Sequence, residues 1–439
     1  MNPLPVATFY FNRRTLSKLL SLILLLVIFS LSGCGDTNKT AAVKEKNTAT
    51  ETSKDIKQSN TLTANDIAHK YIIVDTHIDV PYRLEEKYED VSQTTEDGNF
   101  DYPRAKKGGL DVLFMSIYLP AKLQKTPGKS KELADHLIDL VEKIATQSPD
   151  KFAMAPDTKT LEANFKKGLI SFAMGMENGS GLEGKLENLQ HFYDRGIRYI
   201  TLAHSKANNI SDSSYDPEKL NHGLSAFGKK LIPEMNRLGV MVDVSHISDE
   251  AFYQVMELSQ TPVIASHSSA RFFTPGFERN MSDEMIKLLA KHGGVIQINF
   301  GSTFISQKSA DDYNTFKAAR DAFMAKNNVK QDSPEVEVFV KAYREKHPQV
   351  FASMDDVIAH FKHVIDLVGV EHVGIGSDFD GVGDSLPIGL KDVSAYPNLI
   401  QGLLDIGCSE RDVEKILSGN ILRVWKQVEN YASEHRQTR

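Results

Sequence analysis

The sequence predicts an α/β fold, a (β/α)8 TIM barrel that forms a single domain. Three observations predict it. From residue 70 onward, eight short apolar runs alternate with longer stretches whose apolar residues recur at helical spacing. Each run is almost continuously apolar, which is typical of parallel strands covered on both faces. Several helical stretches end in a glycine just before the next run. A doubly wound open sheet would instead carry a glycine-rich turn after its first strand, and Asp75-Thr76-His77-Ile78-Asp79 is not such a turn.

The elements follow one another along the whole folded body. The expected strands are 71–79, 110–119, 169–177, 198–204, 240–246, 262–267, 294–300 and 372–380. Expected helices between them include 131–145, 186–195, 224–238, 283–291 and 354–368, and the terminating glycines are Gly196, Gly239, Gly293 and Gly369. The segment 301–353 is too long for a simple crossover, so we expect extra helices there, which could form a lid or a partner surface.

The N-terminus has the pattern of an export signal. Arg13, Arg14 and Lys18 precede an apolar run over 19–31 that is too short to span a membrane as a mature helix. Leu31-Ser32-Gly33-Cys34 resembles the lipobox of bacterial lipoproteins, which implies cleavage before Cys34 and lipidation of its thiol. The alternative is an uncleaved anchor helix with a chance cysteine.

The residues after Cys34 are almost entirely polar or alanine as far as residue 62, so they cannot bury a core and should form a solvated tether. We therefore expect a signal peptide over 1–33, a lipidated Cys34 and tether over 34–64, the barrel over 65–432 and a tail over 433–439. The barrel would lie in the cell envelope, outside the cytoplasm, anchored by lipid to a bacterial membrane.

Composition excludes several classes of protein. With 439 residues, 41% of them hydrophobic and 25% charged, the chain is neither wholly disordered nor a multi-span membrane protein. The formal net charge is −7, and the basic N-terminus makes the remaining body more acidic still, which argues against nucleic acid as a partner. Two cysteines, Cys34 and Cys408, cannot form a disulfide framework or a thiolate zinc site.

Chemistry-bearing residues gather at the strand ends. The functional groups of a TIM barrel lie at the C-terminal ends of its strands. Six of the eight expected strands end in a potential metal ligand or acid/base group, namely His77 with Asp79, Glu177, His204, His246, His267 and Asp378. A single histidine on an apolar strand is often a structural residue, but this many at one end of one barrel predict a functional site.

The residue types predict a metal site. Neutral imidazoles and carboxylates without thiolates suit zinc best, then manganese or cobalt. His77 and Asp79, two apart on a strand, face the same way, and Asp75 shares that face, either orienting a ligand or serving as a buried hydrogen-bonded acid. Glu177 follows Met174-Gly175-Met176, where a buried carboxylate needs a metal or a salt bridge to Arg or Lys.

The ligand supply exceeds one tetrahedral ion. We expect one ion on His77 and Asp79, a second on His246 and His267, and Glu177 as the bridge between them. Such a pair can hold a water or hydroxide that is nucleophilic at neutral pH, and Asp378 then has the character of a general base and proton shuttle.

Motifs over roughly residues 65–430, taken together and in order, resemble those of the membrane (renal) dipeptidase family, a group of metal-dependent hydrolases within the amidohydrolase-like barrels. They are Asp75-Thr76-His77-Ile78-Asp79, Gly175-Met176-Glu177-Asn178-Gly179, Leu202-Ala203-His204 with Asn208 and Asp212-Ser213, Asp243-Val244-Ser245-His246, Ser266-His267-Ser268-Ser269-Ala270, Arg279-Asn280 and Gly376-Ser377-Asp378-Phe379-Asp380-Gly381.

The resemblance implies a binuclear zinc hydrolase that cleaves dipeptides and tolerates a D-residue at the C-terminal position. It implies the same five metal ligands, with His204 polarising the scissile carbonyl and stabilising the oxyanion. It implies that Arg279 clamps the free carboxylate of the substrate, and that His204 and Asp378 also contact the substrate. Without the resemblance, Arg279 would be interpreted as a surface arginine in a loop. The resemblance further suggests a homodimer.

Two positions depart from the family pattern. Ile78 stands where an asparagine is common, and Gly301 stands where animal members tend to carry a tyrosine, which bears on the N-terminal side of the substrate. Two alternative functions stay open. One is hydrolysis of another amide or ester in the same fold, such as an N-acyl amino acid or a lactone. The other is a non-catalytic lipoprotein that binds peptides or zinc.

Overall fold

The computed structural model describes residues 62–435. The expected signal peptide, Cys34 and nearly all of the tether lie outside the described residues. Within 62–435, no helix combines the length and the apolarity that a membrane span requires. The last helix runs to His435, past the expected barrel boundary at 432.

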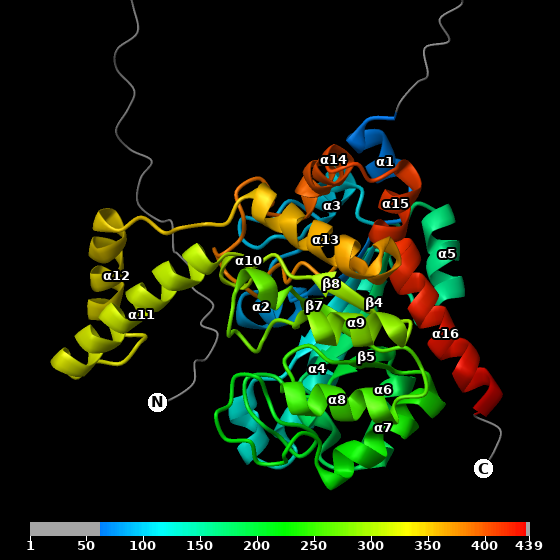
Figure 1. The fold of residues 1–439 in the computed structure, drawn as a ribbon, viewed down its shortest axis with the longest axis horizontal. Coiled ribbons are helices and arrows are strands. Elements are labelled where there is room, and N and C mark those ends of the chain that lie inside the picture. Colours follow the sequence, from blue (N-terminus) through cyan, green and yellow to red (C-terminus); the bar gives the residue numbers. More distant parts are fainter. Residues whose placement is uncertain (1–61, 436–439) are drawn as a thin grey trace, which may run out of the picture. The chain divides into compact units, whose positions relative to one another are not determined.

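Eight parallel strands form the barrel (Figure 1), in the order β1-β2-β4-β5-β6-β7-β8-β9. A bridge between Ile78 and Phe379, just beyond β9, links the last strand back to the first. The strands are β1 Val74–Ile78, β2 Val112–Tyr118, β3 Phe152–Met154, β4 Ile170–Glu177, β5 Ile197–Thr201, β6 Met241–Asp243, β7 Ile264–Ser268, β8 Val295–Ile298 and β9 Val373–Ile375. The predicted fold class is confirmed, and every predicted run contains a strand to within one residue.

Strand β3 is the one that the sequence did not predict. Its three residues are too few to stand out as an apolar run. It pairs with Ile170, Ser171 and Phe172 at the beginning of β4, a stretch that β5 does not reach, because β5 pairs with β4 only from Met174 onward.

Helices follow the strands, and most of them cover the outside of the barrel. They are α1 Ala64–Lys70, α2 Val80–Glu86, α3 Tyr102–Gly108, α4 Lys129–Gln147, α5 Thr158–Lys166, α6 Leu186–Asp194, α7 Ala226–Leu238, α8 Asp249–Leu258, α9 Asp283–Lys291, α10 Ser302–Ile305, α11 Gln307–Asn327, α12 Pro334–Lys346, α13 Met354–Val368, α14 Tyr396–Asp405, α15 Glu410–Glu414 and α16 Asn420–His435. The five helices that the sequence predicted are α4, α6, α7, α9 and α13, each within two residues of its expected ends. Gly239 ends α7 with a φ of 89°, a conformation that glycine adopts without strain.

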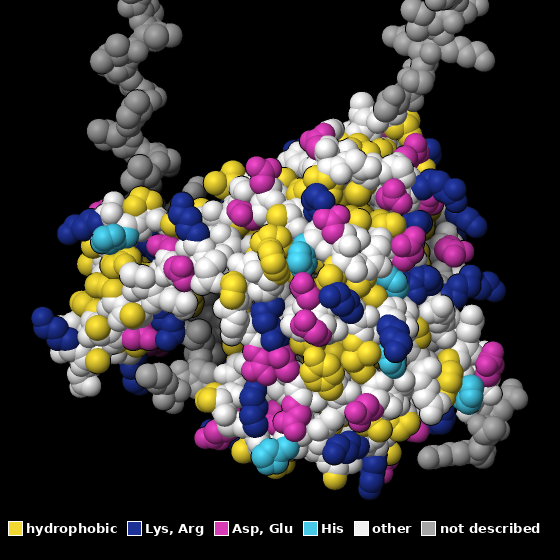
Figure 2. All heavy atoms as spheres, in the orientation of Figure 1, with side chains coloured by type: hydrophobic (Ala, Val, Ile, Leu, Met, Phe, Trp, Pro, Cys, Tyr) yellow, Lys and Arg dark blue, Asp and Glu magenta, His cyan; other side chains and the backbone are white. Residues whose placement is uncertain are grey.

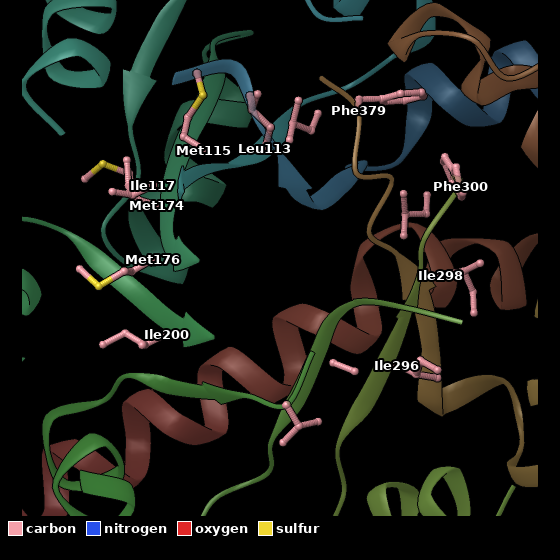
Figure 3. Close-up of a cluster of buried hydrophobic side chains, with 14 of the residues drawn as sticks. Leu113, Met115, Ile117, Met174, Met176, Ile200, Ile296, Ile298, Phe300 and Phe379 are labelled. Carbon is pink, nitrogen blue, oxygen red and sulfur yellow. The ribbon is translucent and has the colours of Figure 1, made fainter. Parts of the chain in front are cut away.

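The core has two parts because residues alternate along each strand. Leu113, Met115 and Ile117 of β2 face the helices and belong to the large outer cluster (Figure 3). Val112 and Phe114 belong to a second cluster, inside the barrel, that includes the first residues of several strands and the apolar face of α16. Helix α16 therefore closes the N-terminal end of the barrel. Its Trp425 is fully buried, with its ring centre 5.2 Å from that of Phe114.

The long segment after β8 contains the extra helices expected there. Helices α11 and α12 form a hairpin that projects from the barrel (Figure 1), and apolar side chains line it (Figure 2). The rings of Phe323 and Phe339 stack at 4.5 Å, and Arg344 pairs with Asp312 at 2.9 Å. The short helix α10 is anchored to the body, because Nε2 of the buried His360 contacts the carbonyl oxygen of Ile305 at 3.0 Å.

Candidate metal centre

The residues predicted from the strand ends come together at the C-terminal end of the barrel. His77 lies in β1, Glu177 ends β4, His267 lies in β7, Asp79 begins α2, and His204, His246 and Asp378 follow β5, β6 and β9. All of them are buried, with at most 8% of any residue exposed. Helix α16 lies at the opposite end, so packing and chemistry occupy different ends of the same barrel.

Glu177 lies between three imidazoles on one side and the imidazole of His77 on the other. Its Oε1 is 3.0 Å from Nε2 of His246 and 3.3 Å from Nε2 of His267. The Nε2 of His204 is 3.5 Å from the same oxygen. Its Oε2 faces the other way and lies 3.6 Å from Nε2 of His77, which is also 3.3 Å from Oδ2 of Asp79. The two oxygens of one carboxylate therefore address separate sets of ligands.

The possible ligand atoms form three overlapping groups. Within each group, all ligand atoms lie within 4.8 Å of one another. The groups are His77 with Glu177 and His267, Glu177 with His204 and His246, and His77 with Asp79 and Asp378. The buried Nε2 of His77 and the buried Nδ1 of His204 and of His246 have no hydrogen-bond partner among the described residues. Unpaired buried nitrogens are costly, and Nε2 of His77 lies beside the carboxylates of Asp79 and Glu177, which fits a site that binds divalent ions. The donors are nitrogen and oxygen without sulfur, which suits zinc.

The electrostatics match what ligands require. Burial, aided by Arg279, lowers the pKa of both His246 and His267 well below its ordinary value, so both imidazoles stay neutral. Burial opposes ionisation of Glu177, but His204 and His77 outweigh it and hold the pKa of that carboxyl well below its ordinary value. Metal ligation needs neutral imidazoles and an ionised carboxylate.

His77 and Asp378 show the opposite shifts. Burial acts to lower the pKa of His77, yet Tyr199 and the carboxylates of Asp79 and Glu177 outweigh burial and raise it well above 6.5. Burial raises the pKa of Asp378 to about 7, although His77 acts in the other direction. The carboxylates of Asp79 and Glu177 act to raise both pKa values, and a pocket with these negative charges favours cations.

Two residues of the site, Asp378 after β9 and His246 after β6, have a strained backbone conformation. Asp378 has a φ of 62°, and His246 has a φ of 68°, in the left-handed region that such residues adopt at a cost. The amide of Asp378 donates to the carbonyl oxygen of His77 at 3.1 Å, and its Oδ2 accepts from Nδ2 of Asn299 at 2.7 Å. These bonds fix the Asp378 carboxylate beside Asp79.

Arg279 is not the surface residue that its position in a loop alone would predict. It is 3% exposed, and its Nη2 donates to the carbonyl oxygen of His267 at 2.6 Å and lies 3.1 Å from Nε2 of His246. Its Nη1 donates to Oγ of Ser268 at 2.7 Å. Its Nε is buried without a partner among the described residues, so the Nε–H donor remains for an anionic ligand.

Aromatic rings that the sequence did not single out flank the metal centre. Tyr215 lies 5.9 Å from the ring of His246 and 6.0 Å from the ring of Phe277, which stacks with Phe304 at 5.8 Å. Tyr118, the last residue of β2, lies 4.9 Å from the ring of His204. A strand that we expected to end without a functional group therefore ends at the site.

Phe304 occupies the space beside Gly301. A Cβ at Gly301 would lie 2.5 Å from Cδ2 of Phe304, and the guanidinium carbon of Arg279 is 5.5 Å from the centre of the Phe304 ring. An aromatic side chain one helical turn further along the chain thus takes the place of a side chain at position 301.

Asp75 acts on the backbone rather than on an imidazole. Its Oδ1 accepts from the amides of His77 and Ser377, both at 3.0 Å, and its Oδ2 accepts from the hydroxyl of Tyr396 at 2.5 Å. The expected orientation of a ligand is therefore indirect, through the main chain of His77. The side chain that contacts Nδ1 of His77 is Tyr199, at 2.7 Å, and the sequence did not single it out because it resembles an ordinary buried strand residue.

The comparisons with known proteins agree on one family. A family model described as membrane dipeptidase (peptidase family M19) matches residues 62–439. Dipeptidase aclJ of Aspergillus oryzae is 33% identical over 341 residues, covering 76% of this chain and 71% of that protein. Dipeptidase 3 of Mus musculus is 32% identical over 369 residues, covering 81% of this chain and 64% of that protein. The solved structure of the probable dipeptidase PvdM from Pseudomonas aeruginosa has a TM-score of 0.73 at 25% identity, covering 84% of this chain and 98% of that one.

Gly381 gives a direct test of the metal centre. A Cβ there would lie 2.2 Å from Oδ2 of Asp79 and 2.3 Å from Oδ1 of Asp378. We expect Gly381→Ala to displace these carboxylates and to weaken the binding of one divalent ion about tenfold or more, with the fold retained. Elemental analysis after dialysis measures this. Gly419→Ala is the control, because its nearest neighbour would be 3.6 Å away. Equal metal retention in both variants would contradict the placement of Asp79 at the centre.

Proposed function

The chain belongs to the membrane dipeptidase family, peptidase family M19, and from this premise we propose that it is a dipeptidase that uses two zinc ions. The observation that carries the proposal is the division of the Glu177 oxygens between the His246–His267 side and the His77 side. His77 and Asp79 would hold one ion, His246 and His267 the other, and Glu177 would bridge them. When bound, the ions supply Lewis acidity and a water activated for attack at neutral pH.

The side chains around the ions supply the remaining chemistry. His204, whose pKa is lowered chiefly by burial, is neutral and donates a hydrogen bond to the scissile carbonyl as negative charge develops on its oxygen. Asp378 accepts a proton from the attacking water and delivers it to the leaving amine. Its raised pKa suits a group that must both take and give a proton near neutrality.

The substrate carboxylate would bind Arg279. The unpaired buried Nε points to a ligand with an acceptor, and a carboxylate matches a guanidinium edge. A dipeptide carries such a carboxylate at a fixed distance from its one peptide bond, so a clamp beside the metal ligand His246 would bring that bond to the ions.

We also propose that dipeptides with a C-terminal D-residue are accepted. A metallo peptidase of Rhodobacter sphaeroides with this fold, at a TM-score of 0.67 and 22% identity over 82% of this chain and 99% of that one, was solved with a phosphinate mimic of the dipeptide L-Ala-D-Ala. That ligand supports the proposal by analogy, because a pocket with its clamp on the carboxylate leaves the configuration at the adjacent carbon less restricted.

The first test combines metal analysis with hydrolysis. We expect near two zinc ions per chain and cleavage of L-Ala-D-Ala that a chelator abolishes and added zinc restores. Asp378→Asn should lower kcat about 10²- to 10⁴-fold with the metal retained, because only the proton transfer is lost. Asp366→Asn, an exposed aspartate on α13, is the matched control. Two bound ions without cleavage of the dipeptide would favour the alternative hydrolase of another amide or lactone, and full activity of Asp378→Asn would remove the base assignment.

The carboxylate clamp is tested by pairing variants with substrates. Arg279→Ala should raise KM about 10- to 100-fold for a dipeptide with a free carboxylate, because a buried charge-assisted hydrogen bond is lost. The same variant should change little for the amide of that dipeptide. Arg279→Lys keeps the charge and should recover only part of the loss. Equal losses on both substrates would contradict the role of Arg279 as a carboxylate clamp.

We propose, from the sequence pattern at Cys34, that the enzyme is anchored by lipid to a bacterial membrane with its barrel outside the cytoplasm. In cells, Cys34→Ser should move the protein from the membrane fraction to a soluble fraction or leave it unprocessed. Cys408→Ser is the control, since Cys408 is a half-buried residue packed against the outer core. Wild-type protein that still carries residues 1–33 in the membrane fraction would support the alternative of an uncleaved anchor helix.

A further inference from the structure

Two histidines of the metal centre have their second ring nitrogen bound to a hydroxyl. The Nδ1 of His77 is 2.7 Å from Oη of Tyr199, and that hydroxyl is 3.0 Å from the carbonyl oxygen of Thr76. A carbonyl only accepts, so the single hydroxyl proton of Tyr199 goes to Thr76. Both contacts are hydrogen bonds only if Nδ1 of His77 carries a proton and donates to Tyr199.

The same arrangement recurs across the barrel with different residues. The Nδ1 of His267 is 2.8 Å from Oγ of Ser266, and this hydroxyl donates to Oδ2 of Asp243 at 2.6 Å. A carboxylate oxygen accepts, so Ser266 has no proton left for His267 and must receive one from its Nδ1. His246 differs, because its Nδ1 has no partner among the described residues.

We propose that Tyr199 and Ser266 are positioning residues that fix the Nδ1-protonated form of His77 and His267, so that each ring presents the lone pair of Nε2 to an ion. The inference rests on the proposed function, because it takes these two histidines as ligands. We call each of these hydroxyl groups a lock, because it fixes the proton on Nδ1 of its histidine. Tyr199 is the lock for the ion on His77 and Asp79, and Ser266 is the lock for the ion on His246 and His267.

The interior of the barrel is built around the first lock. Tyr199 is fully buried, and a Cβ at Gly175 on the neighbouring strand β4 would lie 1.9 Å from Cζ of its ring. The tyrosine therefore reaches His77 across the space that Gly175 leaves free. The centre of its ring lies 5.4 Å from that of Phe114, which packs against it inside the barrel.

The second lock is held by a fully satisfied carboxylate. Oδ1 of Asp243 accepts from the amides of Ser245 and Ser266, at 3.0 and 2.8 Å. Its Oδ2 accepts from the hydroxyl of Thr201 at 2.5 Å as well as from Ser266. Four donors hold this carboxylate in place, so the direction of the Ser266 hydroxyl proton is fixed too.

The test measures zinc affinity and ligand geometry, not catalysis. Ion-free protein is titrated with zinc against a competing chelator. The wild type should show two sites, Tyr199→Phe should weaken one of them about 10- to 100-fold, and Ser266→Ala should weaken the other by a similar factor. Combining the two variants should weaken both sites. Ser266→Thr keeps a hydroxyl and should restore the affinity lost in Ser266→Ala.

Matched controls separate positioning from loss of packing. Tyr71→Phe removes another tyrosine hydroxyl, one that donates to Glu410 before the beginning of β1, and Ser171→Ala removes a buried serine hydroxyl that accepts from Asn164. Both should keep the two zinc affinities of the wild type. If Tyr199→Phe and Tyr71→Phe lowered affinity equally, or if neither Tyr199→Phe nor Ser266→Ala changed it, the inference would be overturned while the dipeptidase proposal would stand.

A spectroscopic measurement reads the ring nitrogens directly. In zinc-loaded protein with ¹⁵N-labelled histidine, long-range ¹H–¹⁵N spectra distinguish a ring ligated through Nε2 from one ligated through Nδ1. We expect His77 and His267, identified by their individual replacement, to be ligated through Nε2 and to carry the proton on Nδ1. Ligation of either through Nδ1 would refute its lock. Failure of the wild type to bind zinc would overturn this inference together with the proposed metal centre.

Discussion

The whole active end of the barrel depends on keeping a carboxylate ionised inside the protein. Glu177 is 4% exposed, and a charge buried to that extent is costly unless opposite charge and hydrogen bonds offset it. Among the described residues its ion-pair partners are all histidines, so the alternative of a salt bridge to Arg or Lys does not occur there. His204 and His77 hold the pKa of Glu177 low through their positive charge, and divalent ions would supply that charge once the imidazoles are neutral ligands. The histidines, the loop conformations and the buried arginine are arranged around that requirement.

Two other aspartates shape the strand ends so that the ligands can converge. Oδ1 of Asp75 joins the amide of His77 to that of Ser377, and Oδ1 of Asp243 joins the amide of Ser245 to that of Ser266. In both cases one carboxylate oxygen accepts from two amides, one that lies two residues further along the chain and one from the adjacent strand or the segment that follows it. In a regular parallel sheet such amides would donate to backbone carbonyl groups instead. Strand pairing is correspondingly irregular in β1 between Asp75 and Ile78 and in β7 between Ala265 and Ser268, where His77 and His267 lie.

The parts that could be predicted from the sequence are those governed by local periodicity. Apolar runs gave the eight strands, and the position of a polar residue at the end of a run placed Glu177 and His267, because strand direction alone decides which end of a barrel a residue occupies. What could not be predicted depends on contacts between distant residues. Tyr199 and Ser266 lie within buried strand segments, and nothing local indicates that their hydroxyls face imidazoles. The residues alone placed Arg279 on the surface, since a position in a loop does not specify where the side chain points.

Three glycines at the site share a physical role that their own backbone does not explain. Gly175, Gly301 and Gly381 are absent from the glycines with positive φ, so another residue would meet no conformational penalty there. A Cβ would instead collide with Tyr199, Phe304 and the Asp79–Asp378 pair, respectively. Each of these glycines therefore leaves space for a particular neighbouring side chain, and neither the glycine nor that side chain can be enlarged without moving the other. A larger residue at 301 would require Phe304 to leave its place beside Arg279, so the two positions determine the shape of that wall together.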